Sequence, residues 1–440
     1  MNLHPRIPGV AGYLISAAAG AMLLCAYWWL TGKVLNPPQQ PQTTHPTEMP
    51  TAAPAAEPPK GPRTMIAERS DAVSKLAELG WTVKPGATDI EFEVTNKQMP
   101  DGQQSAFYFR KLHKPFRLHF QSVKGIAGLH SLSDIAGCTK IEINAGEMTD
   151  IGELRGFKHL KILGMSQTPI NGLSIIDISP ISSMTDLREL NLGGSKVTDV
   201  TPISGLTNLR VLNLYDTPVR DLSPLSRLVL LESLEIRATG ARDMSVLAGM
   251  KYLRELGIDG KQGPDLTKLS HSKALKILRI IDQGNVDLSS VGQLTSLESL
   301  FVWGPPRLDL SPLHTLTSLR DLHISGLGVG NLSAVTGLDA LGKLAELQKL
   351  TLGSLAVSDL TFVSNLKHLT EINIGMMPVS SIEPLRGLAS LTSVSLNLTS
   401  VVDISPLLDL PALKTLSVIR TPARADVLTQ LERSGVKIQR

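Results

Sequence analysis

The sequence predicts a repeat array of the α/β class, in which short strands recur along the chain and stack on one another. The clearest unit is LRVLNLYDTPVRDLSPLSRLVL, from Leu209 to Leu230, which combines L-x-x-L-x-L, T-P-V and D-L-S-P-L segments. This order predicts a short strand followed by a tight turn whose apolar side chains point back to the core. Ten of the twelve intervals between successive units are equal, and the units begin at Cys138, Leu160, Leu187, Leu209, Leu231, Leu253, Leu275, Leu297, Leu319, Leu347, Leu369, Leu391 and Leu413.

The core of such an array forms between units instead of within them. A single unit carries about half a dozen apolar side chains and has no partner face of its own, so it buries them only by stacking on its neighbours. Burial of each aliphatic side chain contributes roughly 1.5 to 3 kcal/mol, which must exceed the ordering entropy of the same residues. Stability is therefore expected to grow with the number of adjacent units.

The repeats resemble leucine-rich repeats of the 22-residue type found in bacterial internalins, whose turns read similarly through a D-I-x-P-L segment. The resemblance covers about residues 115 to 440. It implies a curved solenoid with a parallel sheet on the concave side and short 3₁₀ or irregular turns on the convex side. Internalins usually continue into an immunoglobulin-like segment and a cell-wall attachment region. Neither occurs in these 440 residues, so the host-invasion role of that family is not expected.

An apolar segment near the amino terminus predicts a membrane anchor. The segment from Val10 to Leu30 contains no charged residue, and its length is close to the ~20 residues needed to cross a bilayer as a helix. Aromatic residues gather at its far end, Tyr27 to Trp29, where such rings prefer the membrane interface. We therefore expect an uncleaved anchor over residues 10–32, after a short cytoplasmic tail at 1–9. A cleaved signal peptide, which would leave a secreted or released protein, is the alternative.

Two further segments lie between this anchor and the repeats. Residues 33–63 are rich in proline and poor in large apolar residues, which predicts an extended stalk. Residues 64–114 contain no copy of the repeat, and we expect a small helix-and-strand cap that covers the first exposed leucines of the array. A separate ligand-binding module is the alternative interpretation of this segment.

Periodicity predicts the elements of the N-terminal cap. Apolar positions between Val73 and Ala77 share one helical face, with Ser70 or Asp71 at its start and Gly80 at its end. Alternation predicts one strand over 90–94 and another over 107–112.

At the other end, the repeats span residues 115–421. A C-terminal cap over 422–440 then combines a helix with a final strand. Two intervals between units, from Leu160 to Leu187 and from Leu319 to Leu347, are longer than the rest. They predict loops inserted near 171–176 and near 336–347, where the apolar spacing resembles a short helix.

Two columns of polar residues recur in the turns. An aspartate usually precedes the L-S-P-L-like return, where its carboxylate can accept hydrogen bonds from free backbone N–H groups. We expect this role, not metal binding, at Asp150, Asp177, Asp199, Asp221, Asp243, Asp265, Asp287, Asp309, Asp359 and Asp403. Hydroxyls that satisfy buried backbone at the strand ends are expected from Thr168, Ser195, Thr217, Thr239, Thr399 and Thr421.

Recognition must come from the variable residues between the leucines, because side chains alternate along a strand and these positions face the concave surface. Most of them are small or polar, but one zone carries the aromatic and arginine side chains that dominate binding hot spots. The predicted binding patch consists of Tyr215, Arg237, Asp259, Arg279, Ile281, Phe301, Trp303 and His323. In the alternative interpretation, Phe301 and Trp303 fold against the loop at Pro305 and Pro306 and merely cover it.

Composition and motifs argue against other classes. The net charge is +3 and no long basic stripe is evident along the chain, so nucleic acid is not an expected partner. The two cysteines suggest neither a disulfide nor a metal site. No H-E-x-x-H, phosphate-loop or G-x-S-x-G motif is present, so we expect no catalytic residue, cofactor or enzymatic activity.

These observations predict a single-pass membrane protein that binds a protein partner through its concave face. The bulk of the chain is expected outside the cytoplasm, in the periplasm or at the cell surface. A carbohydrate or cell-wall binding module is the alternative of a different class, because the rings of Trp303 and Phe301 would suit a sugar equally well.

Overall fold

The structure is a computed structural model, and residues 65–440 form one compact unit in it. The described residues are 62–85, 90–95, 100–121, 125–144, 148–166, 174–259, 266–269, 273–281, 286–328 and 332–440. The predicted anchor at 10–32 and most of the predicted stalk lie outside these ranges. Among the described residues, no helix combines the length and apolar character that crossing a bilayer requires.

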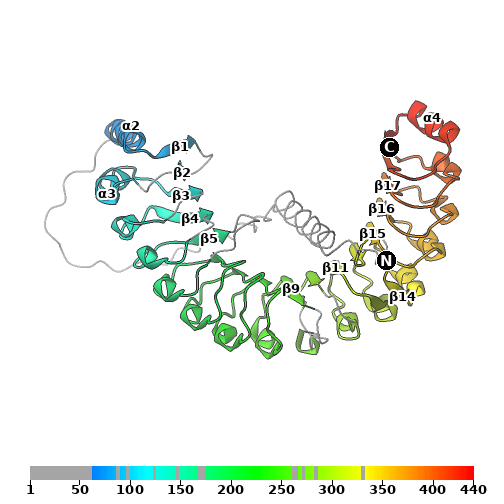
Figure 1. The fold of residues 1–440 in the computed structure, drawn as a ribbon, viewed down its shortest axis with the longest axis horizontal. Coiled ribbons are helices and arrows are strands. Elements are labelled where there is room, and N and C mark those ends of the chain that lie inside the picture. Colours follow the sequence, from blue (N-terminus) through cyan, green and yellow to red (C-terminus); the bar gives the residue numbers. More distant parts are fainter. Residues whose placement is uncertain are drawn as a thin grey trace, which may run out of the picture. The chain divides into compact units, whose positions relative to one another are not determined.

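The compact unit is a solenoid built on one 17-stranded sheet (Figure 1), as the resemblance implied. Every strand pair in it is parallel except the first, β1 with β2. The strands line the inner side of the arc in Figure 1. Those of the repeats are β3 (Phe116–Gln121), β4 (Cys138–Asn144), β5 (Ile162–Ser166), β6 (Glu189–Asn191), β7 (Val211–Asn213), β8 (Ser233–Glu235), β9 (Glu255–Asp259), β10 (Ile277–Ile281), β11 (Ser299–Trp303), β13 (Asp321–Ser325), β15 (Lys349–Gly353), β16 (Glu371–Asn373), β17 (Ser393–Ser395) and β18 (Thr415–Ser417).

Short 3₁₀ helices form the outer side of the arc (Figure 1). They are η1 (Leu129–Leu132), η2 (Gly152–Leu154), η3 (Ser179–Ile181), η4 (Thr201–Ile203), η5 (Ser223–Arg227), η6 (Ser245–Gly249), η7 (Thr267–Leu269), η8 (Val291–Gln293), η9 (Ser311–Thr315), η10 (Leu338–Lys343), η11 (Thr361–Asn365), η12 (Glu383–Leu385) and η13 (Ser405–Asp409). Proline often opens these turns, because its missing N–H is not needed in the first turn of a helix.

The core lies between the sheet and the 3₁₀ turns. Leu212 and Leu214 are fully buried, whereas Asn213 between them faces the other side and is half-buried. Parallel pairing places each leucine beside its equivalent in the next repeat, as Leu212 beside Leu234. The repeat period in the sequence therefore becomes a continuous row of leucines along the solenoid.

An aromatic cap closes the N-terminal end. It consists of α2 (Pro62–Glu78), β1 (Thr82–Pro85), β2 (Ile90–Thr95) and α3 (Gly102–Arg110). Trp81 packs edge-to-face against Phe92 and Phe109, with ring centroids 6.3 and 5.2 Å away, and its Nε1 donates to Ser105 Oγ at 2.9 Å. Strand β2 pairs in parallel with β3, so the cap continues the sheet of the repeats.

Two predictions within this cap were wrong. The predicted start of α2 at Ser70 or Asp71 is too late, since the helix begins at Pro62, whose fixed φ suits a first helical position. Its predicted end at Gly80 is confirmed by a φ of +107° there. The predicted strand over 107–112 is instead the end of helix α3 and the turn that follows it, and in this helix Phe109 is buried and Phe107 is exposed. Two aromatic residues at i and i+2 mimic alternation when only one of them faces the core.

The C-terminal cap has the predicted elements. Helix α4 (Ala425–Arg433) buries Val427, Leu428 and Leu431, and β19 (Lys437–Gln439) pairs in parallel with β18. Gly435 lies between them with a φ of +94°, a conformation that glycine adopts without strain.

The longer of the two extended repeat intervals contains one strand of an additional pair, β14, whose partner β12 lies in the preceding repeat. β12 (Arg307–Asp309) and β14 (Ala334–Thr336) form a two-stranded parallel sheet in which Leu308 pairs with Val335. This is a wider step along the chain than in the preceding strands, where Phe301 pairs with His323. Most of the extra length therefore lies between Ser325 and β14, not in the predicted segment 336–347, which forms an ordinary convex turn, η10. The other predicted insertion, near 171–176, lies partly outside the described residues.

The aspartate column has the predicted capping role. At each of the nine described positions, Oδ1 accepts a hydrogen bond from the backbone N–H two residues later, at 2.7 to 2.9 Å. In the hydroxyl column, Thr217, Thr239 and Thr399 each donate to a backbone carbonyl at 2.7 Å, as predicted. The prediction was wrong for Ser195, whose buried hydroxyl has no hydrogen-bond partner among the described residues. Asp265 and Thr168 lie outside the described residues.

These caps predict a loss of stability in acid. At Asp199, hydrogen bonds from the hydroxyl and then the backbone N–H of Thr201 lower the carboxyl pKa, and the same pair of donors, backbone first, lowers the pKa of Asp243 beside Ser245. A lowered folded-state pKa stabilises the fold above the unfolded pKa of about 3.9, and this contribution is lost as pH falls through the lower folded values. Thermal unfolding from pH 6 to 2 should therefore show that Asp199→Asn with Asp243→Asn is less stable than the wild type at pH 6 and closer to it at pH 2. An equal difference at both pH values would contradict the charged-cap assignment.

Candidate functional site

The predicted patch lies on the concave face of the sheet. Pairing of β10, β11 and β13 places Arg279, Phe301 and His323 side by side, and places Ile281 beside Trp303 in the next column. The intervening residues of β11, such as Leu300 and Val302, belong to the leucine core. The alternation expected from the sequence is therefore the alternation that the strand adopts.

Three rings form a compact group, here called the concave aromatic cluster: Phe301, Trp303 and His323. Phe301 and Trp303 stack with centroids 5.6 Å apart and planes at 12°, and His323 lies 5.3 Å from Trp303 and 6.1 Å from Phe301. Phe301 is only 9% exposed, yet it does not belong to the leucine core cluster. It is therefore covered by other side chains of the concave face, and Trp303 is the more accessible of the two large rings.

Two arginines flank the cluster. The Arg279 guanidinium lies 5.7 Å from the Phe301 ring centroid, and its Nη1 donates to Glu255 Oε2 at 3.2 Å. The Arg237 guanidinium lies 5.6 Å from the Tyr215 ring and 5.9 Å from the Trp303 ring. Both distances suit cation–π contact, so Arg237 bridges the aromatic residues of two different repeats.

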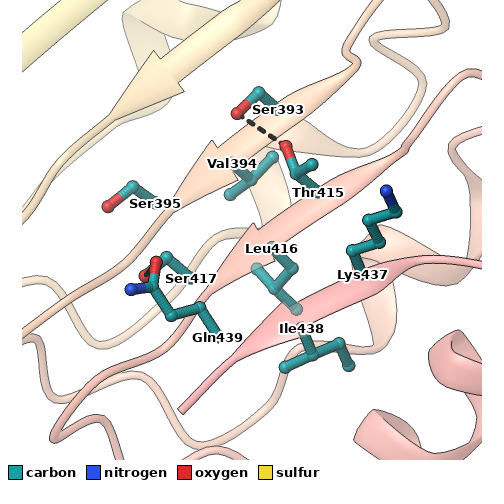
Figure 2. A pocket seen from close by; sticks show the side chains of 9 residues that line it. All are labelled: Ser393, Val394, Ser395, Thr415, Leu416, Ser417, Lys437, Ile438 and Gln439. Atoms are coloured by element: carbon teal, nitrogen blue, oxygen red, sulfur yellow. Dashed lines mark hydrogen bonds between the residues drawn. The ribbon is translucent and has the colours of Figure 1, made fainter.

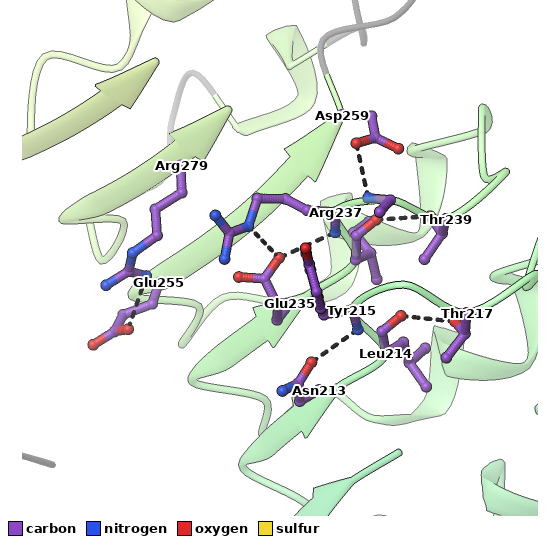
Figure 3. A network of polar contacts seen from close by, with 12 residues as sticks. Asn213, Leu214, Tyr215, Thr217, Glu235, Arg237, Thr239, Glu255, Asp259 and Arg279 are labelled. Atoms are coloured by element: carbon purple, nitrogen blue, oxygen red, sulfur yellow. Dashed lines mark hydrogen bonds and ion pairs between the residues drawn. The ribbon is translucent and has the colours of Figure 1, made fainter. Parts of the chain in front are cut away.

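Arg237 is held in place by a neighbouring carboxylate (Figure 3). Its Nε donates to Glu235 Oε1 at 2.7 Å, and its backbone N–H donates to the same oxygen at 3.0 Å. A glycine on the adjacent strand makes room for this pair, because a Cβ on Gly257 would lie 2.2 Å from Glu235 Oε1. The Glu235 carboxylate therefore compensates the charge of Arg237. Because Arg237 is only 8% exposed, its guanidinium is held beneath the surface of the patch.

The remaining predicted residues have more local roles. Asp259 Oδ1 accepts from the backbone N–H of Ala238 at 2.8 Å, which supports a turn where Ala238 has a φ of +56°. The backbone N–H of Tyr215 donates to Asn213 Oδ1 at 2.8 Å. Ile281 is half-buried beside Trp303. The structure thus brings Tyr215, Arg237, Arg279 and the aromatic cluster into one network, while Asp259 supports the backbone.

Sequence reasoning missed the carboxylates and the glycine that organise this network. Glu235, Glu255 and Gly257 lie on the strands next to the patch. A carboxylate or a glycine at such a position does not indicate a role in the site until its neighbour on the adjacent strand is known. Pairing of Glu235 with Gly257 and proximity of Glu255 to Arg279 supply that signal.

Burial of His323 predicts a measurable pH dependence. Desolvation lowers its pKa from 6.5 to about 4, so the ring is neutral near pH 7. As pH falls, the unfolded chain binds the proton before the folded protein does. The contribution of the neutral His323 ring to folding stability is therefore intact above about pH 6.5 and is lost as pH falls toward 4. The loss should be about 2 to 3 kcal/mol by the pKa difference. Urea unfolding at pH 7 and pH 4.5 should show a smaller decrease for His323→Gln than for the wild type; equal decreases would contradict the assignment.

A hollow lies at the C-terminal end of the sheet, on strands β17 to β19 (Figure 2). It encloses about 310 Å³ and is lined by Ser393, Val394, Ser395, Thr415, Leu416, Ser417, Lys437, Ile438 and Gln439. Its hydroxyls bond one another and their neighbours, as Thr415 Oγ1 donates to Ser393 Oγ at 2.9 Å and Ser417 Oγ to Asn397 Oδ1 at 2.8 Å. The hydroxyls of Thr415 and Ser417 on this open surface are therefore already bonded to neighbouring side chains.

Comparison with solved structures supports the fold. An internalin from Listeria monocytogenes superimposes with a TM-score of 0.53 and 24% identity, over 80% of this chain and 94% of that one. A leucine-rich-repeat protein from Leptospira interrogans gives a TM-score of 0.58 and 16% identity, over 78% of this chain and 93% of that one. No protein-family model and no curated protein sequence matches the chain.

The two structural likenesses, the regular register of the strands and the capped 3₁₀ turns converge on one assignment. The chain has a leucine-rich-repeat fold, and its solenoid is similar to those of the Listeria internalin and the Leptospira protein.

Proposed function

We propose that the concave face from β7 to β13 binds a protein partner, with Trp303 as the central contact. The observation that carries this proposal is the group of stacked rings between two arginines on a concave surface that is otherwise mainly small and polar. Binding hot spots concentrate in tryptophan, tyrosine and arginine, because these side chains combine large contact area with a polar group. Rings held by their neighbours also lose little entropy when a partner arrives.

Two exposed apolar side chains follow the strand that carries His323. Leu327 is 43% exposed and Leu332 is 42% exposed, and both belong to the insertion that follows β13, the strand that carries His323. Exposed apolar side chains in the loop after this strand favour a partner that excludes water over a broad contact, as a protein surface does.

A carbohydrate partner is the second candidate, and the geometry favours it less. A sugar ring stacks on an exposed aromatic face, whereas Phe301 is 9% exposed and stacks on Trp303. The two rings therefore do not form an open two-ring platform, and only Trp303 could offer a face.

We further propose that the chain is anchored in a membrane by residues 10–32, with the repeats outside the cytoplasm. This proposal is supported by the uncharged apolar segment from Val10 to Leu30. Retention in the membrane fraction after alkaline carbonate extraction, together with cleavage of the repeats by protease added outside the cytoplasmic membrane, would agree with it. Release of a shortened mature chain would identify a cleaved signal peptide instead.

Capture of the partner tests the binding proposal. The full chain, Trp303→Ala and a control, Phe107→Ala, would be used as baits, followed by quantitative mass spectrometry. Phe107 is a suitable control because it is an aromatic residue 55% exposed on α3, away from the concave cluster. A partner should be enriched by the wild type and the control and depleted with Trp303→Ala. Equal enrichment by all three baits would contradict the proposed site.

A further inference from the structure

A row of charged side chains follows the edge of the sheet where the strands begin. Each member comes directly after the first leucine of its repeat, and together they are called the edge ladder: Lys161, Arg188, Arg210, Glu232, Arg254, Lys276, Glu298 and Arg320. Backbone hydrogen bonds of 2.7 to 2.9 Å join every neighbouring pair, beginning with the N–H of Arg188, which donates to the carbonyl of Lys161. The members therefore lie in consecutive repeats, about 4.8 Å apart.

Only two of the six cations in the ladder are neutralised. Arg210 pairs with Glu232, and Lys276 Nζ lies 2.9 Å from Glu298 Oε1. Lys161, Arg188, Arg254 and Arg320 are exposed, and none of them forms an ion pair with another residue in the described ranges. The ladder thus keeps four uncompensated positive charges along one edge, in a chain whose net charge is only +3.

The uncompensated arginines recur with a period of three repeats. Arg188, Arg254 and Arg320 are equally spaced along the chain and occur in the matching segments LREL, LREL and LRDL. The repeats that supply the ladder's two glutamates both read LESL, and they too are three repeats apart. Three strand spacings separate successive arginines by about 14 Å. Because neighbouring members of the ladder are a full repeat apart in the chain, a search for basic runs does not find them.

The acidic residue that follows each of these arginines does not compensate its charge. Side chains of successive residues in a strand point to opposite sides, and Glu255, which follows Arg254, instead accepts from Arg279 on the concave face. Glu189 and Asp321 are half-buried at the equivalent positions. The guanidinium groups of the ladder therefore remain available along the rim of the concave site.

We propose that the edge ladder binds carboxylates of the protein partner, an inference that rests on the proposed function and assigns an acidic face to that partner. Guanidinium groups bind carboxylates through two parallel hydrogen bonds, which favours arginine at this kind of contact. A uniformly negative polymer, such as nucleic acid or a sulfated glycan, would be repelled by Glu232 and Glu298, because one glutamate interrupts the positive charges every three repeats. The interrupted row fits a folded surface that presents carboxylates at intervals.

A defined acidic probe tests this inference without the natural partner. A fluorescein-labelled decapeptide of alternating glutamate and serine should bind the full chain more tightly at low salt than at high salt. The triple variant Arg188→Gln, Arg254→Gln, Arg320→Gln should weaken this binding roughly tenfold, since each exposed charge contributes a modest increment. The matched control is Arg227→Gln, Lys268→Gln, Lys343→Gln, which removes the same charge from exposed positions on η5, η7 and η10.

The outcomes separate this inference from the function on which it rests. The peptide assay does not use the natural partner, so its result does not depend on whether Trp303→Ala weakens capture of that partner. Equal losses in the two triple variants, or no measurable binding, would overturn the ladder as a binding site. Tighter ladder-dependent binding of a heparin oligosaccharide or an oligothymidine of equal charge would replace the acidic protein with another polyanion and so overturn the proposal.

Discussion

Replacing Trp303 with alanine is expected to weaken partner binding by about 30-fold or more, which corresponds to the roughly 2 kcal/mol that defines a binding hot spot. The indole stacks on Phe301 and contacts the guanidinium of Arg237, so its removal takes away the accessible end of the cluster. The leucine core is untouched, because Leu300 and Val302 point to the other side of β11. Titration of the captured partner by calorimetry would measure the loss.

Two companion variants make this result interpretable. Phe301→Ala is unsuitable as a binding variant because the ring is 9% exposed, and we expect it to cost about 3 kcal/mol of folding stability. Gly257→Ala leaves every ring in place but forces the Glu235 carboxylate aside and so releases Arg237. It should weaken binding less than Trp303→Ala does. Unchanged affinity in Trp303→Ala, at unchanged thermal stability, would contradict the assignment of the hot spot.

Replacing Phe92 with alanine is expected to cost about 3 to 5 kcal/mol of folding free energy, the usual range for removing a buried ring. Phe92 is fully buried and packs edge-to-face on Trp81, Phe109 and Phe116, with the Phe109 centroid 4.9 Å away. Because repeats contact mainly their neighbours, loss of the cap should first open the repeats beside it. Hydrogen exchange should accelerate in β3 and β4 while β16 to β18 remain protected.

Phe107→Ala provides the matched control for the cap. This ring belongs to the same cap but is 55% exposed, and it contacts Lys111, whose Nζ is 4.2 Å from the ring centroid, and the ring of Tyr108, whose centroid is 5.1 Å away. Its removal should change stability by no more than about 0.5 kcal/mol. Uniform acceleration of exchange throughout the array in Phe92→Ala would show that the solenoid unfolds as one cooperative unit, contrary to the local opening expected here.

The sequence predicts the solenoid well because its signal is redundant. A leucine period that recurs at a fixed interval determines strand register, the core face and the concave face together, and Asp199 or Thr217 can be assigned to turn capping from its position alone. The positions of Phe301 and Trp303 on the hollow side follow from the same alternation.

Features that do not recur from repeat to repeat, such as the cap and individual side-chain contacts, were predicted less well. The cap lacks a repeat, so Phe107 and Phe109 suggested a strand where helix α3 forms. The burial of Phe301 could not be foreseen, because it results from the packing of Trp303, His323 and Arg279 around its ring. The carboxylate that holds Arg237 and the edge ladder become visible only when residues of neighbouring repeats are placed side by side.

Site-specific photo-cross-linking in cells tests most directly whether the concave face is the recognition surface. A benzophenone amino acid at Ile281, beside Trp303, should form an adduct with the partner, whereas the same probe at the exposed convex residue Ser226 on η5 should not. Adducts from position 226 alone, or from neither position although the partner is present, would contradict binding through the concave aromatic cluster.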